Sequence, residues 1–573
     1  MEKTIKQLIT AYFILIVIKT ILASLIPAPS AFADDYTYIK MARSFFISGE
    51  FSIHGVLTSA YPPLYPIIIS LSYIFNDMNL VYFFMKFINV ILITSIIFPS
   101  YLIAKEFLPK KDSFLVSLLI SFIPSIFAFP VYIMAESLFY PLFLFAVYFL
   151  YKSFIEKSYL WDILAGLFIG LLYLTKVIGV AIIPVVLVSF IACSIYNKKQ
   201  FIFQLKKKLV LGCLALLTIL PWILRNIRLY GFSFKGIMGS TISSSESVAA
   251  LSGKYTFEVF ATMFIFYLTF FVLSSGILFF ISSFSTIKKM LRNNKLFTIS
   301  TIFISSLLFF ILIAVNHNSA VIKHITLYPW LTGKFIGRYV DPVLPLFFIL
   351  GFIGYKYLKK DKKIIKILIF LAPLLIFSSQ IIYLSLYPIN NLSLTWIGVL
   401  NYFLNYILYS STNFMPLPTL FVSFIFAFMF VFFVIISIYI PNKFSLRKIL
   451  PYFMIFFLIN SLLSLGVIYY DSNRFWHNGE QTKLGLWFNE YDKDKFSTIL
   501  FDIRDGDGID KYNQTNIYGG KGTYTIIGFW MNDEISIGDI KDAKNKDYIV
   551  SRHILEYPVL YKTKNGVFLY KVN

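Results

Sequence analysis

Apolar runs of about twenty residues recur along most of this sequence, which is the length an α-helix needs to cross a bilayer. Hydrophobic residues make up 58% of its 573 positions, whereas soluble domains hold about 45–50%. We therefore expect a polytopic α-helical membrane protein with about thirteen transmembrane helices. The expected spans are 8–27, 80–104, 113–130, 136–151, 160–175, 177–196, 209–228, 260–285, 296–315, 339–357, 364–385, 417–440 and 449–469.

The composition changes near residue 470 to that of a soluble domain. Residues 470–573 hold 14 Lys and Arg and 15 Asp and Glu, while residues 1–469 hold 37 basic and 14 acidic residues. The sequence thus predicts a transmembrane domain, 1–469, with an outer loop at 28–79, and a small α/β domain, 470–573. Within the second domain, Asn565-Gly566 is a hairpin signal. Its expected elements are a helix at 478–491 and strands at 497–501, 548–551, 559–561 and 567–572.

Most basic residues of the transmembrane domain lie in short connectors on the same side as Lys3 and Lys6. The positive-inside rule makes that side cytoplasmic. We therefore expect a multi-pass protein of the cell membrane, with a cytoplasmic N-terminus and an extracytoplasmic C-terminal domain. Because topology accounts for the net charge of +22, we expect no nucleic-acid partner. The basic connectors hold Lys105, Lys110 and Lys111; Lys198, Lys199 and Lys206 to Lys208; Lys288, Lys289, Arg292 and Lys295; Lys356 to Lys366; and Lys443, Arg447 and Lys448.

The first outer connector carries two adjacent carboxylates, Asp34 and Asp35. Acidic residues at the surface of a hydrophobic protein are costly unless they are solvated or used. The alternative role is an N-cap, since Asp caps helices well, and an amphipathic helix is expected at 36–48. Such a helix would lie in the membrane interface. A second short interfacial segment is expected at 64–76.

Further charged residues lie at the outer ends of predicted spans. Glu136 begins a span, where an acid complements the helix N-terminus. Lys176 lies at a tight turn, where snorkelling to the interface is the simple alternative. Arg225 ends one span and Arg338 begins another. Three cations on the face that the positive-inside rule disfavours, together with a carboxylate, suggest a site for an anionic headgroup such as a phosphate.

The order of these motifs resembles that of the GT-C fold integral-membrane glycosyltransferases. The similarity covers about residues 1–470 and is greatest to the dolichyl-phosphate-mannose protein mannosyltransferase and aminoarabinose transferase group. The Trp-Trp-Asp signature of oligosaccharyltransferases is absent. The motifs are Asp34-Asp35, Pro-Pro-Leu at 62–64, Glu-Ser-Leu-Phe-Tyr-Pro-Leu at 136–142, Leu-Thr-Lys at 174–176, Pro-Trp-Ile-Leu-Arg-Asn at 221–226 and Arg-Tyr-x-x-Pro-x-x-Pro at 338–345.

This resemblance implies inverting transfer of a sugar from a polyprenyl-phosphate donor to an acceptor hydroxyl outside the cytoplasm. The acceptor would be a glycan, a lipid or a protein. In such enzymes the first acid after span one is critical, which implies a catalytic Asp34 with Asp35 as the lesser partner. Tyr339 would contact the carrier phosphate.

The chain also departs from the pattern. Aminoarabinose transferases carry Glu-Lys before Pro-Pro-Leu, whereas this chain has Ala60-Tyr61. Without that Lys, the remaining cations must do more of the phosphate binding. The expected contacts to substrate and phosphate are Lys176, Arg225, Arg338, Tyr339, Glu136 and Tyr61.

Two other classes of protein compete with this interpretation. A transporter or flippase of lipid-linked saccharides would more often have repeated halves and ionisable residues at mid-membrane. A receptor-like protein with a ligand-binding outer domain would leave the long first outer loop unexplained. Neither a repeat nor a mid-membrane cluster is visible in the sequence.

No metal site is evident in the sequence. The two cysteines, Cys193 and Cys213, lie in apolar runs, and the five histidines lack ligand spacing on one helix. The Asp505 to Asp510 segment hints at a calcium loop but lacks the spacing of an EF-hand. We expect no required cofactor, with a divalent cation as the alternative.

Overall fold

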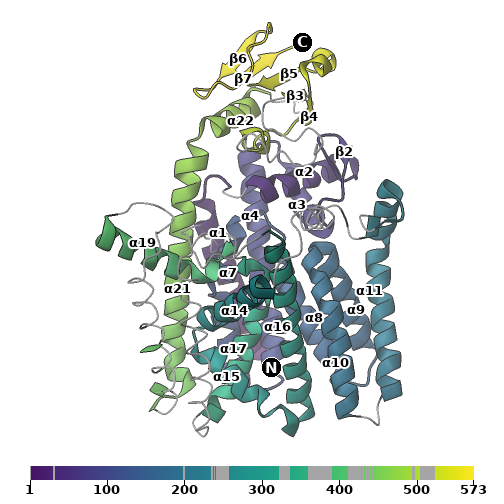
Figure 1. The fold of residues 1–573 in the computed structure, drawn as a ribbon, viewed down its shortest axis with the longest axis vertical. Helices are drawn as coiled ribbons and strands as arrows, with labels where there is room; N and C mark the ends of the chain where they lie inside the picture. Colours follow the sequence, from purple (N-terminus) through teal and green to yellow (C-terminus); the bar gives the residue numbers. More distant parts are fainter. Residues whose placement is uncertain are drawn as a thin grey trace.

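The structure, a computed structural model, is a long helical bundle with a small sheet domain at one end and the N-terminus toward the other (Figure 1). It describes residues 2–29, 32–197, 201–233, 236–237, 239, 257–321, 336–358, 390–410, 443–492, 497–503 and 523–572, and isolated positions between 428 and 440.

Within the described ranges, eight helices are long and apolar enough to span a membrane, or up to ten if two bent helix pairs each count as one span. Each predicted span coincides with a helix or a bent pair, except 364–385 and 417–440, which lie almost wholly outside the described residues. The polytopic helical class is confirmed, and the count of thirteen stays a prediction. The main helices are α1 (Glu2–Ser24), α4 (Met78–Thr94), α5 (Ile97–Ala104), α8 (Glu136–Ile155), α9 (Leu160–Thr175), α10 (Ile182–Tyr196), α11 (Phe201–Tyr230), α16 (Asn294–Val321), α17 (Leu344–Leu358), α19 (Thr395–Tyr409) and α21 (Leu446–Asp471).

The two bent pairs are α6 (Lys110–Ser121) with α7 (Pro124–Phe127) and the adjoining turn, and α14 (Phe257–Ser274) with α15 (Leu278–Ile287). The second pair bends by 107°. Ile277 precedes α15 with a φ of 57°, a backbone conformation that costs energy for a β-branched residue. The bend therefore depends on packing around it, and Ile277 is buried.

Close helix packing depends on small residues. Gly166 and Gly170 on α9 face α11, and a Cβ at either position would collide with α11 atoms, such as the Leu214 Cβ at 2.9 Å and the Thr218 Cγ2 at 2.7 Å. Spacing of four residues places both glycines on one helix face. Small residues at this spacing let helix backbones approach closely in membranes. Helices α9 and α11 are therefore closely packed along this face.

The C-terminal domain is a mixed sheet with two helices. Strand β3 pairs in parallel with β4 and β5, and β7 pairs antiparallel with β5 and β6. The predicted helix, four strands and hairpin at Asn565-Gly566 are confirmed, with Gly566 at a φ of 74°. Strand β4 and helix α23 were not predicted. The elements are α22 (Glu480–Tyr491), β3 (Thr498–Asp502), α23 (Thr523–Phe529), β4 (Glu534–Gly538), β5 (Tyr548–Ser551), β6 (Val559–Lys562) and β7 (Phe568–Lys571).

The first outer connector forms α2 (Phe32–Ser48), a two-stranded hairpin of β1 (Ser52–Ile53) and β2 (Val56–Leu57), and α3 (Leu64–Ser70). The helix predicted at 36–48 is confirmed, and the predicted segment 64–76 contains α3 and a 3₁₀ turn, η1 (Leu71–Ile74). The polar side of α2, which the sequence assigned to the membrane interface, instead contacts the C-terminal domain. Lys40 Nζ donates to the Met531 carbonyl oxygen at 2.8 Å, and Arg43 Nε donates to Asn532 Oδ1 at 3.0 Å. These contacts follow from burial, because a buried charge needs hydrogen-bond partners.

Candidate functional site

Four charged side chains meet at the end of the bundle nearest the C-terminal domain. Arg338 Nη2 lies 3.1 Å from Asp34 Oδ2, and Arg338 Nε lies 3.7 Å from Glu136 Oε1. Lys176 forms an ion pair with Glu136. We call these four residues the charged cluster. It joins motifs that are up to 304 positions apart in the sequence.

Each member of the charged cluster lies at the end of an element. Asp34 is in the first turn of α2, and Glu136 is the first residue of α8. Lys176 has extended backbone between α9 and a 3₁₀ turn, η3 (Val177–Ala181). Arg338 belongs to another 3₁₀ turn, η7 (Gly337–Tyr339). A carboxylate is favoured at a helix N-terminus, so both acids lie where the helix dipoles support them.

The turn that carries Arg338 is held from two sides. The Gly337 N–H donates to Asn391 Oδ1 at 3.1 Å, and the Tyr140 hydroxyl donates to the Arg338 carbonyl oxygen at 3.0 Å. A Cβ at Gly337 would collide with the Phe270 ring and would lie 2.8 Å from Asn391 Oδ1. The close approach therefore requires glycine at this position. Sequence reasoning missed both residues: Tyr140 lies in the Glu-Ser-Leu-Phe-Tyr-Pro-Leu motif but received no role, and Asn391 belongs to no recognisable motif.

Aromatic side chains surround the cluster. The Tyr61 hydroxyl donates to Asp34 Oδ1 at 2.7 Å, and Tyr38 stacks on the Tyr61 ring at 4.4 Å between centroids. Lys176 Nζ lies 5.1 Å from the centroid of the Tyr339 ring, within the range of a cation–π contact. The Tyr339 hydroxyl lies 3.4 Å from Nε2 of His317, a residue that the sequence did not assign to the site.

The cations keep Asp34 ionised. Burial alone would raise the pKa of Asp34, but Arg338, the Tyr61 hydrogen bond and Lys176 together hold it below its usual value. Burial lowers the pKa of Lys176, and Glu136 only partly offsets this effect. Burial raises the pKa of Tyr339 to about 12, so its hydroxyl keeps its proton at neutral pH.

The contacts of Asp34 bear on its two possible roles. Its two carboxylate oxygens bind Tyr61 and Arg338, which belong to other elements. These side-chain contacts favour use in a site over a role limited to capping α2. Asp35 is fully buried. Burial is the largest cause that raises the pKa of Tyr65, and the charge of Asp35 raises that pKa further.

Arg225 lies outside the charged cluster. Its Nη1 donates to the Thr58 carbonyl oxygen at 3.0 Å, and its Nη2 donates to the Phe51 carbonyl oxygen at 3.1 Å. Its guanidinium also lies 4.9 Å from the Trp222 ring centroid. The structure therefore brings six of the eight predicted residues together, namely Asp34, Tyr61, Glu136, Lys176, Arg338 and Tyr339. Arg225 instead holds the hairpin of the first outer connector, and Asp35 is buried.

No group of three or more His, Cys, Asp or Glu side chains suited to a metal ion occurs in the part of the chain that the structure describes. The 505–510 segment lies outside that part. The expectation about cofactors therefore stays a prediction.

Comparison with known proteins identifies the fold. Residues 60–224 match the family model of dolichyl-phosphate-mannose-protein mannosyltransferase. The structure is similar to ArnT from Cupriavidus metallidurans bound to undecaprenyl phosphate, with a TM-score of 0.58, 12% identity and 97% coverage of both chains. For ArnT in the apo state the TM-score is 0.57, with 12% identity and 98% coverage of both chains. A search of curated proteins finds no match. The chain thus has the GT-C fold, as the motif order predicted.

Proposed function

We propose that this protein is an inverting glycosyltransferase that moves a sugar from a polyprenyl-phosphate donor to an acceptor hydroxyl. The observation that carries the proposal is the charged cluster, in which a carboxylate and two cations meet beside Tyr339. The mannosyltransferase match over residues 60–224 and the ArnT-like fold support the same class of reaction. ArnT was crystallised with undecaprenyl phosphate, which supports a lipid-phosphate donor here.

In the proposed step, the acceptor oxygen attacks the anomeric carbon of the donor sugar while the bond from that carbon to the phosphate oxygen breaks. Asp34 takes the proton from the acceptor hydroxyl as general base. The electron pair of the broken bond leaves with the polyprenyl phosphate. A single displacement inverts the anomeric carbon.

The two cations would bind the phosphate of the donor and of the product. The phosphate gains negative charge as the sugar leaves, and preorganised cations stabilise such charge in a site sheltered from water. Arg338 can hold two phosphate oxygens, whereas Lys176 acts as a point charge. In the structure, two carboxylates pair with these two cations. The donor phosphate must therefore compete with Asp34 for Arg338.

Charge bias puts this reaction on the extracytoplasmic face of the membrane. The C-terminal domain contacts the polar side of α2, the helix whose first turn carries Asp34. We assign this domain the role of shaping the acceptor entrance, without chemistry of its own. The acceptor would be a glycan, a lipid or a protein, and the transferred sugar a hexose or a pentose.

The experiment is a transfer assay with the purified protein in lipid vesicles. Polyprenyl-phosphate mannose and a polyprenyl-phosphate pentose serve as donors, and membrane extract serves as the acceptor. Release of polyprenyl phosphate together with a glycosylated product of inverted configuration supports the proposal. Movement of intact donor between leaflets, without release of phosphate from either donor, would instead identify a flippase.

A further inference from the structure

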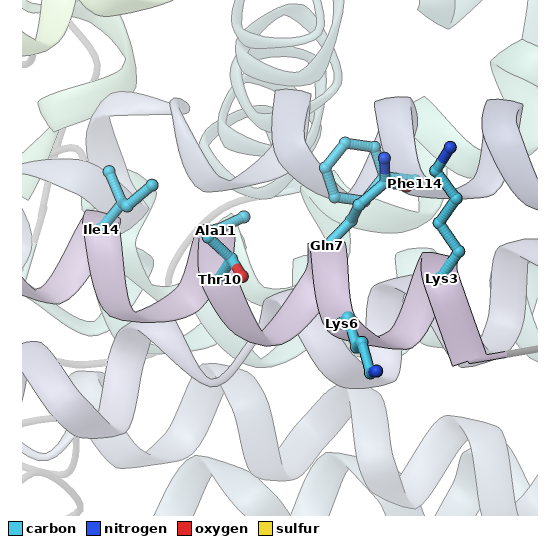
Figure 2. Close-up of a pocket in the computed structure, with 7 residues that line it drawn as sticks. All are labelled: Lys3, Lys6, Gln7, Thr10, Ala11, Ile14 and Phe114. Atoms are coloured by element: carbon cyan, nitrogen blue, oxygen red, sulfur yellow. The ribbon is translucent and has the colours of Figure 1, made fainter.

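A groove lies at the opposite end of α1 from the charged cluster. It has a volume of about 630 Å³ and runs between the first half of α1 and α6. Figure 2 shows the side chains that line it, Lys3, Lys6, Gln7, Thr10, Ala11 and Ile14 from α1 and Phe114 from α6. Since an α-helix rises about 1.5 Å per residue, Lys3 lies about 30 Å along α1 from Ser24, at the end of α1 that leads to Asp34.

The polarity of the groove changes along α1. Lysine side chains line its first turn, Gln7 and Thr10 follow, and Ala11 and Ile14 form the apolar end. Phe114 lies beside Gln7 (Figure 2). Lys3 and Ile14 are separated by about 16 Å along the helix axis. A charged end, a hydrogen-bonding middle and an apolar end match the order of groups in a phospholipid.

The second wall of the groove also carries a cation. Lys110 begins α6 and precedes Phe114 by four residues, so both side chains lie on one face of that helix. Lys3 and Lys110 are both exposed. Positive charge therefore flanks the polar end of the groove from both helices.

The apolar end of the groove opens onto a hydrophobic surface of α1. Ile9, Phe13 and Ile14 on this helix are 42%, 59% and 54% exposed. On a membrane-spanning helix, such a surface contacts acyl chains. An acyl chain can therefore enter the groove from the bilayer while its headgroup reaches the lysines.

We propose that this groove binds one anionic glycerophospholipid, with its phosphodiester between Lys3 and Lys110 and an acyl chain along Ala11 and Ile14. Basic pockets between transmembrane helices bind anionic headgroups in this way. A zwitterionic lipid carries its own cation and gains less from the two lysines. The proposal does not depend on the proposed enzyme activity.

The test measures lipid binding to the purified full-length protein by native mass spectrometry. Dioleoyl phosphatidylglycerol is the probe, and dioleoyl phosphatidylcholine is the neutral comparison. Each lysine near an anionic lipid contributes about fivefold in affinity. We expect the double variant Lys3→Gln/Lys110→Gln to bind phosphatidylglycerol about 30-fold more weakly, with little change for phosphatidylcholine.

Two further variants test whether the loss of phosphatidylglycerol binding comes from the groove rather than from a change in general surface charge or from misfolding. Lys157→Gln/Lys206→Gln removes two exposed cations, one in the connector before α9 and one on α11, and should leave phosphatidylglycerol binding unchanged. Ile14→Trp fills the apolar end and should weaken that binding without a change of charge.

Three results would overturn the proposal. The first is equal binding of the two lipids by the unmodified protein. The second is an equal loss in the Lys157/Lys206 control. The third is unchanged binding in Ile14→Trp together with full displacement of the lipid by glycerol phosphate, which would identify an anion site without a seat for a lipid tail.

Discussion

Replacement of Asp34 by Asn should lower turnover and, at the same time, strengthen binding of the product, polyprenyl phosphate. General-base catalysis contributes about 10²–10⁴ in rate, so under the proposed mechanism turnover should fall by at least about 10²-fold. Binding of the product, polyprenyl phosphate, should become tighter, because the substitution frees Arg338 from its 3.1 Å contact with Asp34. A residue that only shaped the site would weaken both.

The size of the gain follows from electrostatics. Two anions that share one guanidinium lie roughly 6 Å apart and repel by about 1.4 kcal/mol at an effective dielectric of about 40. The side chain of Asp34 is 26% exposed, which justifies a value between those of water and a protein interior. Removal of this repulsion corresponds to about a tenfold gain in affinity.

Binding is measured by titration of the purified protein with polyprenyl phosphate in detergent, with thermal stability and native mass spectrometry as the two readouts. Turnover is measured separately in the transfer assay. Asp35→Asn is the matched control, since the ion pairs of Arg338 in the structure go to Asp34 and Glu136. That variant should gain no affinity. Weaker binding of polyprenyl phosphate by a folded Asp34→Asn protein, or full turnover, would refute the reasoning.

Three other predictions follow from the contacts of the site and of the C-terminal domain. Arg338→Ala should weaken polyprenyl-phosphate binding by about 10–100-fold, since charged hydrogen bonds contribute about 1.5–3 kcal/mol. Arg338→Lys should restore that binding only in part, and unchanged affinity in Arg338→Ala would exclude this residue from phosphate binding. Because the pKa of Asp34 is held low by Arg338, activity should be lost as pH falls through that pKa, and Arg338→Lys should move this acid limb of kcat/KM to higher pH; an unmoved limb would assign it to another group. A cysteine replacing Asn565 should react with a membrane-impermeant thiol reagent in intact cells, and reaction only after lysis would contradict the extracytoplasmic placement.

The sequence predicted the bundle because span length and charge bias are local properties. An apolar run needs no knowledge of its neighbours to be a transmembrane helix, and an Asn-Gly pair carries its own turn preference. Strand β4 was missed because it is an edge strand of five residues, Glu534–Gly538, with a polar start and a glycine end. Its place beside β3 depends on a tertiary contact rather than on a strong local pattern.

The sequence predicted most of the residues that form the candidate site, but not which of them contact one another. Arg225 and Arg338 look alike in the sequence, since both are cations at the outer end of an apolar run. Only the fold separates them, because Arg225 donates to carbonyl oxygens of the first outer connector while Arg338 reaches Asp34 and Glu136. Tyr61, which stands where a phosphate-binding lysine is expected, instead donates to Asp34.

The balance of charge in the cluster bears on the order of events in the proposed reaction. Asp34 pairs with Arg338, and Glu136 pairs with Lys176. A base whose charge is held by a cation is a weaker base, since the cation stabilises the ionised form. When the donor phosphate takes a share of Arg338, that stabilisation falls and Asp34 becomes more basic. The donor would therefore prepare the base for the acceptor, which favours binding of the donor before the acceptor.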